Sequence, residues 1–97
     1  MGFEVDTSEV RRAAKEIKRI AESVSVLSSQ NVNRMQSSVS QNLEGETADA
    51  IAEVLSDLSV DIRRISAALS DVQEALIDYA ERIEEADEKA KRESEAN

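Results

Sequence analysis

Residues 51–90 read IAEVLSDLSVDIRRISAALSDVQEALIDYAERIEEADEKA. Apolar side chains recur along this stretch at alternating steps of four and three residues, which keeps one narrow face of an α-helix apolar throughout. A β-strand would scatter the same residues over both faces, because its side chains alternate with a period of two. The repeating positions are Ile51, Leu55, Leu58, Ile62, Ile65, Leu69, Val72, Leu76, Tyr79, Ile83, Ala86 and Ala90.

A helix over this stretch cannot bury its own apolar face. From about residue 47 to residue 90 it would be roughly 65 Å long at 1.5 Å per residue, far longer than a compact domain of this size is wide. Either the first half of the chain or another molecule must cover it.

The first half carries an apolar seam of the same spacing and predicts a helix over about residues 7–42, with Asp6 or Thr7 as its N-cap. The seam consists of Val10, Ala13 or Ala14, Ile17, Ile20, Val24 and Leu27. Its register slips after Leu27, where the next apolar residue is Val32 instead of residue 31. Such a stutter changes the winding without ending the helix. A loop is the alternative, because residues 28–42 are rich in Ser, Gln and Asn.

The one clear break between the two seams is the turn at residues 43–46, with the motif Leu43-Glu44-Gly45. The chain has no proline, and Gly45 is its only glycine apart from Gly2. Gly45 suits the left-handed residue that closes a helix, and Thr47 can cap the next one. Two long helices joined by so short a connection must lie antiparallel.

A turn centred on residues 44 and 45 would place residue i level with residue 89 − i. Apolar positions then coincide, and opposite charges pair as Arg11 with Asp78, Lys15 with Glu74 and Lys18 with Asp71. The apolar stripe of the second helix is wider than one partner needs, so we expect the all-α hairpin to dimerise into a four-helix bundle. The predicted hairpin and dimer contacts are Val10, Ile17, Ile20, Val24, Leu27, Leu58, Ile62, Ile65, Leu69, Val72 and Leu76.

The ends of the chain fall outside this pairing. Residues 1–83 form the predicted hairpin, with its second helix from about residue 47, and residues 84–97 are a charged overhang, either a helix end or a disordered tail. Phe3 is expected to anchor an interface or to pack on the first helical turn.

Composition excludes several functions. Without Cys or His there is no disulfide and no conventional zinc site, and two helices offer no cleft for catalysis, so neither an enzyme nor a cofactor is expected. The net charge of −9 argues against nucleic acid and anionic membranes as partners. No apolar run is long enough for stable membrane insertion, and the first residues lack the features of a cleaved signal peptide.

A helical hairpin of about 100 residues with an acidic balance, a short turn and a start such as Val5-Asp6-Thr7 resembles the WXG100, or ESAT-6-like, family of Gram-positive bacteria. The resemblance covers nearly the whole chain. Gly45 matches the glycine of the family's Trp-x-Gly turn, whereas Leu43 stands where the tryptophan usually is. It implies a small substrate of a type VII (ESX-like) secretion system, made in the cytoplasm and found outside the cell or on its surface, often linked to virulence.

The resemblance also implies partners and a signal. The partners would be a second copy, a related hairpin protein or an LXG toxin, together with the secretion-system ATPase. The family's C-terminal signal is often Tyr-x-x-x-Asp/Glu. Here Tyr79 fits its first position, Ile83 occupies the fourth position after it and Glu84 comes one residue late; a looser form reads Ile83 followed by Asp87.

Two other functions are open. A cytoplasmic coiled-coil scaffold or adaptor could carry the same heptads by convergence, and a Leu at the turn is similar to helical proteins that act as targeting partners of LXG toxins. Finding the chain in the medium of producing cells with its N-terminus uncleaved would separate a secreted protein from a scaffold.

Overall fold

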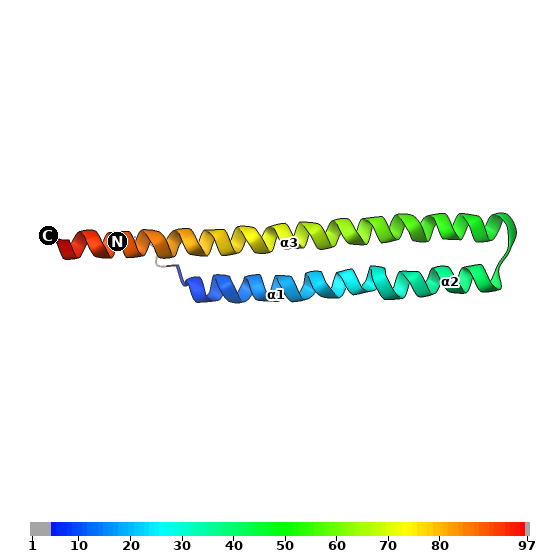
Figure 1. Cartoon of the computed structure of the whole chain (residues 1–97), viewed down its shortest axis with the longest axis horizontal. Coiled ribbons are helices and arrows are strands. Elements are labelled where there is room, and N and C mark those ends of the chain that lie inside the picture. Colours follow the sequence, from blue (N-terminus) through cyan, green and yellow to red (C-terminus); the bar gives the residue numbers. More distant parts are fainter. Residues whose placement is uncertain (1–4, 97) are drawn as a thin grey trace.

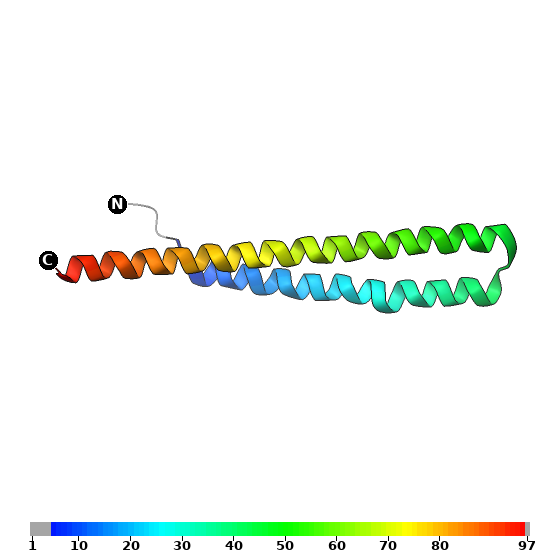
Figure 2. The same ribbon diagram turned by 45° about the horizontal axis from the view of Figure 1, so that its top comes forward.

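The two halves of the chain form helical arms that lie side by side and run in opposite directions (Figures 1 and 2). The structure, a computed structural model, describes residues 5–96, so Phe3 lies outside the described residues. The first arm contains α1 (Thr7–Val26), a π-helical segment η1 (Leu27–Val32) and α2 (Asn33–Asn42), and the second is α3 (Gly45–Ala96). The predicted antiparallel two-helix hairpin is confirmed.

The hairpin is a slender rod. Its principal extents are 79 × 18 × 15 Å and its radius of gyration is 22.2 Å, against about 13 Å for a compact chain of 100 residues. Every side chain therefore lies close to solvent, and burial depends on the single contact between the two arms.

The first arm begins with a side-chain cap. The Asp6 carboxylate accepts a hydrogen bond from the backbone N–H of Ser8 at 3.0 Å and another from the Ser8 hydroxyl at 2.5 Å. The hydroxyl bond holds the pKa of Asp6 below its ordinary value, and the bonds to backbone N–H groups add to the effect. Of the two caps that the sequence allows, the structure selects Asp6, which satisfies a backbone donor that the first turn leaves free.

The arm remains helical where the apolar register slips. Residues Leu27–Val32 form one stretch of π-helix, which accommodates one extra residue, and the chain then continues as α2. The stutter interpretation is confirmed and the loop alternative is wrong. After this wider turn, the apolar side chains again face the second arm. Val32 shows this, because it is only 2% exposed.

The turn is tighter than expected. Leu43 is extended, and its N–H donates to the carbonyl oxygen of Val39 at 2.9 Å. Gly45 has φ +80° and already begins α3, so Thr47 lies inside the helix and the predicted cap at that residue is wrong. With only two residues between the arms, a positive φ at Gly45 reverses the chain without a longer loop.

Substituting Gly45 tests this explanation. A β-carbon there would meet no atom within 4 Å, so any loss of stability comes from the left-handed backbone alone. We expect Gly45→Ala to lower the free energy of unfolding by about 1–2 kcal/mol, and Gly45→Asn, which tolerates this conformation, to lower it less. Urea denaturation followed by circular dichroism measures both; equal losses for the two variants would contradict this account.

The register of the arms differs from the predicted one by two residues. The Ser28 and Ser59 hydroxyls are 2.7 Å apart, and the Ser66 hydroxyl donates to the carbonyl oxygen of Ala21 at 3.1 Å. Residue i therefore lies level with residue 87 − i in this part of the hairpin. The reason is the tight turn, since the first arm ends at Asn42 and the second begins at Gly45.

Because the register differs, the predicted charge pairs between the arms do not form. Arg11 pairs with Glu84 instead of Asp78, and Asp78 pairs with Arg82 on its own helix. Lys15 and Lys18 form no ion pair with any residue between 5 and 96.

Candidate functional site

The surface most suited to binding is a row of large apolar side chains along α3. Leu58, Ile65, Val72 and Tyr79 lie seven residues apart and are 41, 53, 46 and 50% exposed. Each of them comes one residue before a side chain that is buried or half-buried against the first arm, namely Ser59, Ser66, Gln73 and Ala80. Ser59, Ser66 and Ala80 are small and allow the two arms to approach closely. The large residues that precede these contact positions lie on the flank of the hairpin.

The first arm contributes to the same flank. Ile20 and Leu27 are 39 and 45% exposed, and each precedes a buried residue, Ala21 and Ser28. In an antiparallel helix pair, positions that precede the contact positions on the two helices project to the same side of the pair. Val54, which is 65% exposed and precedes the buried Leu55, lies on the same flank. This flank therefore carries seven large apolar side chains, which we call the apolar flank: Ile20, Leu27, Val54, Leu58, Ile65, Val72 and Tyr79.

The opposite flank is mostly polar, with Val60 as an exposed apolar residue on it. It contains the ion pair between Arg11 and Glu84 and a shallow groove lined by Ser25, Ser28, Ser29, Asn33, Ser59 and Arg63. A hairpin with one apolar and one polar flank presents a single face on which a further helix pair can pack.

The structure divides the predicted contact residues into two groups. Those half-buried between the arms are Val10, Ile17, Val24, Ile62, Leu69 and Leu76. Those exposed on the apolar flank are Ile20, Leu27, Leu58, Ile65 and Val72. Contact of the second group with another molecule remains a prediction.

The turn motif lies at the closed end of the hairpin, where the side chain of Leu43 is 41% exposed. A shallow groove at this end is lined by Gln36, Val39, Ser40, Leu43, Glu44, Gly45, Ala48, Asp49 and Ala52. A leucine here offers a small apolar contact without the indole N–H that a tryptophan would present.

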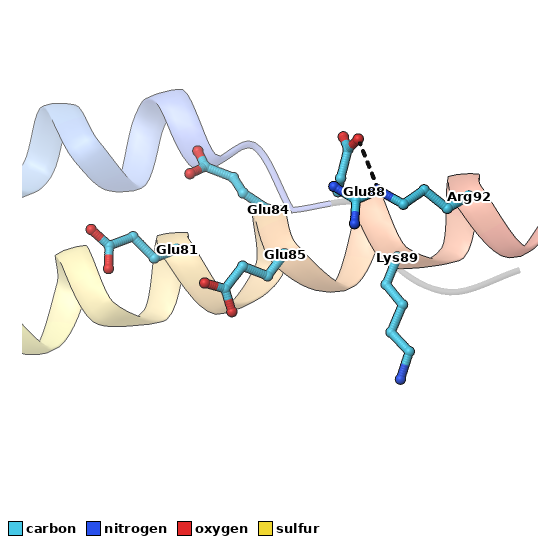
Figure 3. Close-up of a pocket in the computed structure, with 6 residues that line it drawn as sticks. All are labelled: Glu81, Glu84, Glu85, Glu88, Lys89 and Arg92. Carbon is cyan, nitrogen blue, oxygen red and sulfur yellow. Dashed lines mark ion pairs between the residues drawn. The ribbon is translucent and has the colours of Figure 1, made fainter.

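The candidate signal residues lie on the last turns of α3 and do not form one cluster. Tyr79 and Asp87 are exposed, Ile83 is half-buried and Glu84 binds Arg11. Figure 3 shows the hollow nearby, lined by Glu81, Glu84, Glu85, Glu88, Lys89 and Arg92, with the Glu84 side chain directed toward the first arm. The hollow is open and mostly acidic, and Glu88 already pairs with Arg92 at 3.6 Å.

Glu84 on α3 forms an ion pair with Arg11 on α1 near the open end of the hairpin. The Arg11 guanidinium donates two hydrogen bonds to the Glu84 carboxylate in a bidentate contact, from Nη2 to Oε1 at 2.6 Å and from Nε to Oε2 at 3.2 Å. The hydrogen bond from Arg11 lowers the pKa of Glu84 below its ordinary value, and a hydrogen bond from Thr7 lowers it further. The overhang, which we define as residues 85–96, begins directly after this contact.

The stability that the Arg11–Glu84 contact contributes should depend on pH. Because the folded-state pKa of Glu84 is depressed, its contribution to stability is present above the ordinary glutamate pKa of about 4.5 and disappears as the pH falls through the lower folded-state value. Glu84→Gln should therefore lower the thermal midpoint at pH 7 and leave it nearly unchanged near pH 3. Glu85→Gln is the matched control, and an equal fall at pH 7 for both variants would contradict a specific role for Glu84.

Three contacts between the arms were not predicted from the sequence. The Arg11–Glu84 pair joins residues that the 89 − i register places six positions apart, so charge matching alone could not find it. The Ser28–Ser59 and Ser66–Ala21 contacts had a readable signal, because Ser59, Ser66 and Ala80 are small residues at multiples of seven and mark a line of close helix approach.

Other kinds of site find no support in the part of the chain that the structure describes. Residues 5–96 contain no group of three or more carboxylates placed to hold a metal ion. None of the helices formed by these residues is both long enough and apolar enough to cross a bilayer.

Comparison with known proteins gives one match. A family model described as proteins of 100 residues with WXG matches residues 2–88, which is most of the chain. Searches of curated proteins and of solved structures give no match.

Proposed function

The chain belongs to the WXG100 family, and from this membership we propose that it is a small secreted helical protein, a substrate or co-secreted partner of a type VII secretion system, that acts through dimerisation. The observation that carries the proposal is the combination of the family match with a hairpin whose apolar side chains lie along one flank. Proteins of this family are small helical proteins associated with type VII secretion.

The hairpin supports a role in binding rather than in chemistry. Its apolar flank is suited to a second hairpin, either another copy or a related chain, which would complete a four-helix bundle. Within residues 5–96, the turn and the charged end of α3 are also exposed, and we propose them as contacts for the secretion ATPase. We therefore propose that the protein leaves the cytoplasm folded and without a cleaved signal peptide.

Leu43 favours a second candidate role. The Leu43-Glu44-Gly45 turn keeps the glycine of the family motif but not its tryptophan, so the chain is suited to serve as the partner of a protein that supplies the aromatic residue. A targeting partner of an LXG-type toxin is one such role.

Export from producing cells tests the proposal. The chain should appear in the medium with its N-terminus intact in cells that have the secretion ATPase, and should remain inside cells from which that ATPase has been deleted. A cytoplasmic marker protein serves as the control for cell lysis and should be absent from the medium of both strains. Retention of the chain in both strains would favour a coiled-coil scaffold and would refute secretion.

A further inference from the structure

Burial between the two arms stops before the turn. Val32 on the first arm and Leu55 on α3 are 2 and 9% exposed. They lie level with each other in the register that places residue i beside residue 87 − i. Beyond this layer, α2 contains no buried residue, and neither do residues 45–54 of α3. The end of the hairpin nearest the turn therefore lacks the buried side chains that stabilise the rest of it.

A polar side chain occupies the inner face of α2. The α2 residues directed toward α3 are Gln36 and Val39, and both are only half-buried. The same register places them level with Ile51 and Ala48. A glutamine and an alanine remove little apolar surface from water, so these two layers add little free energy to the packing of α2 on α3. The largest apolar side chain of α2, Met35, is 48% exposed.

In the part of the chain that the structure describes, no side-chain hydrogen bond or ion pair joins α2 to α3. The polar side-chain contacts between the arms involve residues 7–28 of the first arm. Asn33 and Asn42 instead donate to the carbonyl oxygens of Ser29 and Ser38, four residues earlier in the same arm, at 2.7 and 2.8 Å. Partly buried contacts and the turn are therefore what keep α2 beside α3.

The residues of α2 have little tendency to remain helical without tertiary contacts. The helix has ten residues, NRMQSSVSQN, of which three are serines and two are asparagines, and these residue types favour other backbone conformations. A helix of this length is unstable in water by itself. The π-helical segment separates it from α1, in which Ala14 and Ala21 are buried. Loss of its contacts with α3 would therefore unfold α2 without unfolding α1.

The start of α3 differs from α2 in this respect. Residues 45–54 continue directly into the rest of a helix of 52 residues. They include three alanines, the best helix formers, and Glu46 in the first turn, where the helix dipole favours negative charge. These residues are expected to stay helical when α2 leaves.

We propose that α2 detaches from α3 and unfolds as a separate unit, with the π-helical segment as its boundary, while α1 and α3 remain helical and packed. The Leu43-Glu44-Gly45 turn follows α2 directly (Figure 1), and it keeps its tight conformation only while α2 is packed on α3. Detachment of α2 is thus a conformational switch for the turn. The inference depends on neither secretion nor dimerisation.

Hydrogen exchange of the purified full chain, corrected for the intrinsic rate of each amide, measures this opening. Amides of residues 36–42 should exchange at least about 10-fold faster than those of residues 14–24. Amides of residues 50–54 should exchange more slowly than those of residues 36–42, because α3 stays helical there. Equal protection of α1 and α2 would overturn the proposal, as would exchange in residues 50–54 as fast as in α2.

Limited proteolysis tests the same opening by a second method. Trypsin cleaves after Lys and Arg, and Arg34 is the only such residue between Arg19 and Arg63. Arg19 and Arg34 are both exposed on helices of the first arm, so the two sites differ mainly in local stability. Cleavage after Arg34 should be at least about 10-fold faster than after Arg19, each rate being divided by that of a peptide of the same local sequence. Equal normalised rates would refute separate opening of α2.

A substitution in α1 distinguishes local from global opening. Ala14 is buried in α1, and Ala14→Gly should speed exchange of residues 14–24 about 5-fold by weakening that helix. Exchange of residues 36–42 should change less than about 2-fold, because α1 stays folded when α2 opens. An equal increase in both segments would show that the first arm opens only as a whole, and would overturn the proposal.

A substitution in α2 tests the cause of the opening. Gln36→Leu would bury more apolar surface between the arms, so exchange of residues 36–42 should slow about 5-fold or more. Gln41→Leu is the matched control, because Gln41 is exposed on the same helix; it should change this exchange less than about 2-fold. Equal slowing by both variants would refute weak packing of the inner face as the reason that α2 detaches.

Discussion

Val32→Asp should unfold the hairpin at room temperature or reduce it to a partly helical chain. Val32 is 2% exposed and is the largest side chain that the structure buries fully within residues 5–96. A carboxylate at this site would lose its water without gaining a cationic partner, which costs 3 kcal/mol or more. Because one contact between two arms holds the fold, no other part of the chain can offset a loss of that size.

Val26→Asp is the matched control. Val26 precedes the π-helical segment by one residue and is 47% exposed, so the same substitution should change the free energy of unfolding by less than about 0.5 kcal/mol. Circular dichroism at 222 nm during heating compares the two variants. A cooperative transition for Val32→Asp at the wild-type temperature would show that the π-helical segment is not part of the folded core.

Deleting residues 85–97 should abolish export while leaving the hairpin folded. Residues 85–96 are exposed and follow the last contact between the arms, Arg11 with Glu84. The deletion removes Asp87 and the charged helix end, and retains Tyr79, Ile83 and Glu84. It therefore separates recognition at the end of α3 from the stability of the hairpin.

Two measurements are needed for this deletion. The purified variant should unfold close to the wild-type temperature, and producing cells should retain it. Replacing the same segment with an Ala- and Lys-rich helix of equal length controls for its bulk and helicity. A truncated chain that still reaches the medium would place the determinant of export elsewhere in the molecule.

The fold could be predicted from sequence because each of its causes is local. Alternating steps of four and three residues predicted both arms, Gly45 predicted the reversal, and the slip between Leu27 and Val32 predicted an irregularity that does not end the helix. These signals depend on side-chain direction along a single helix, which residue spacing determines.

The contact between the arms was only partly predictable, because it depends on how each helix is rotated about its axis. A single seam through Leu55, Leu58 and Ile62 averages two directions that the structure separates: Leu55 is buried against the first arm, whereas Leu58 is 41% exposed. Ser59 takes the inner position because its small side chain and its hydrogen bond to Ser28 favour close approach. Spacing by itself does not show which of two adjacent residues faces inward.

The narrow cross-section of the hairpin determines the size of pore that the proposed export would require. Its backbone spans 18 × 15 Å across and 79 Å along its axis, whereas a sphere with the radius of gyration of a compact chain of this length would be about 34 Å in diameter. Moving lengthwise, the protein needs an aperture little wider than two adjacent helices and breaks no internal contact during transit. A channel that admits this hairpin end-on can therefore exclude most folded globules by size alone.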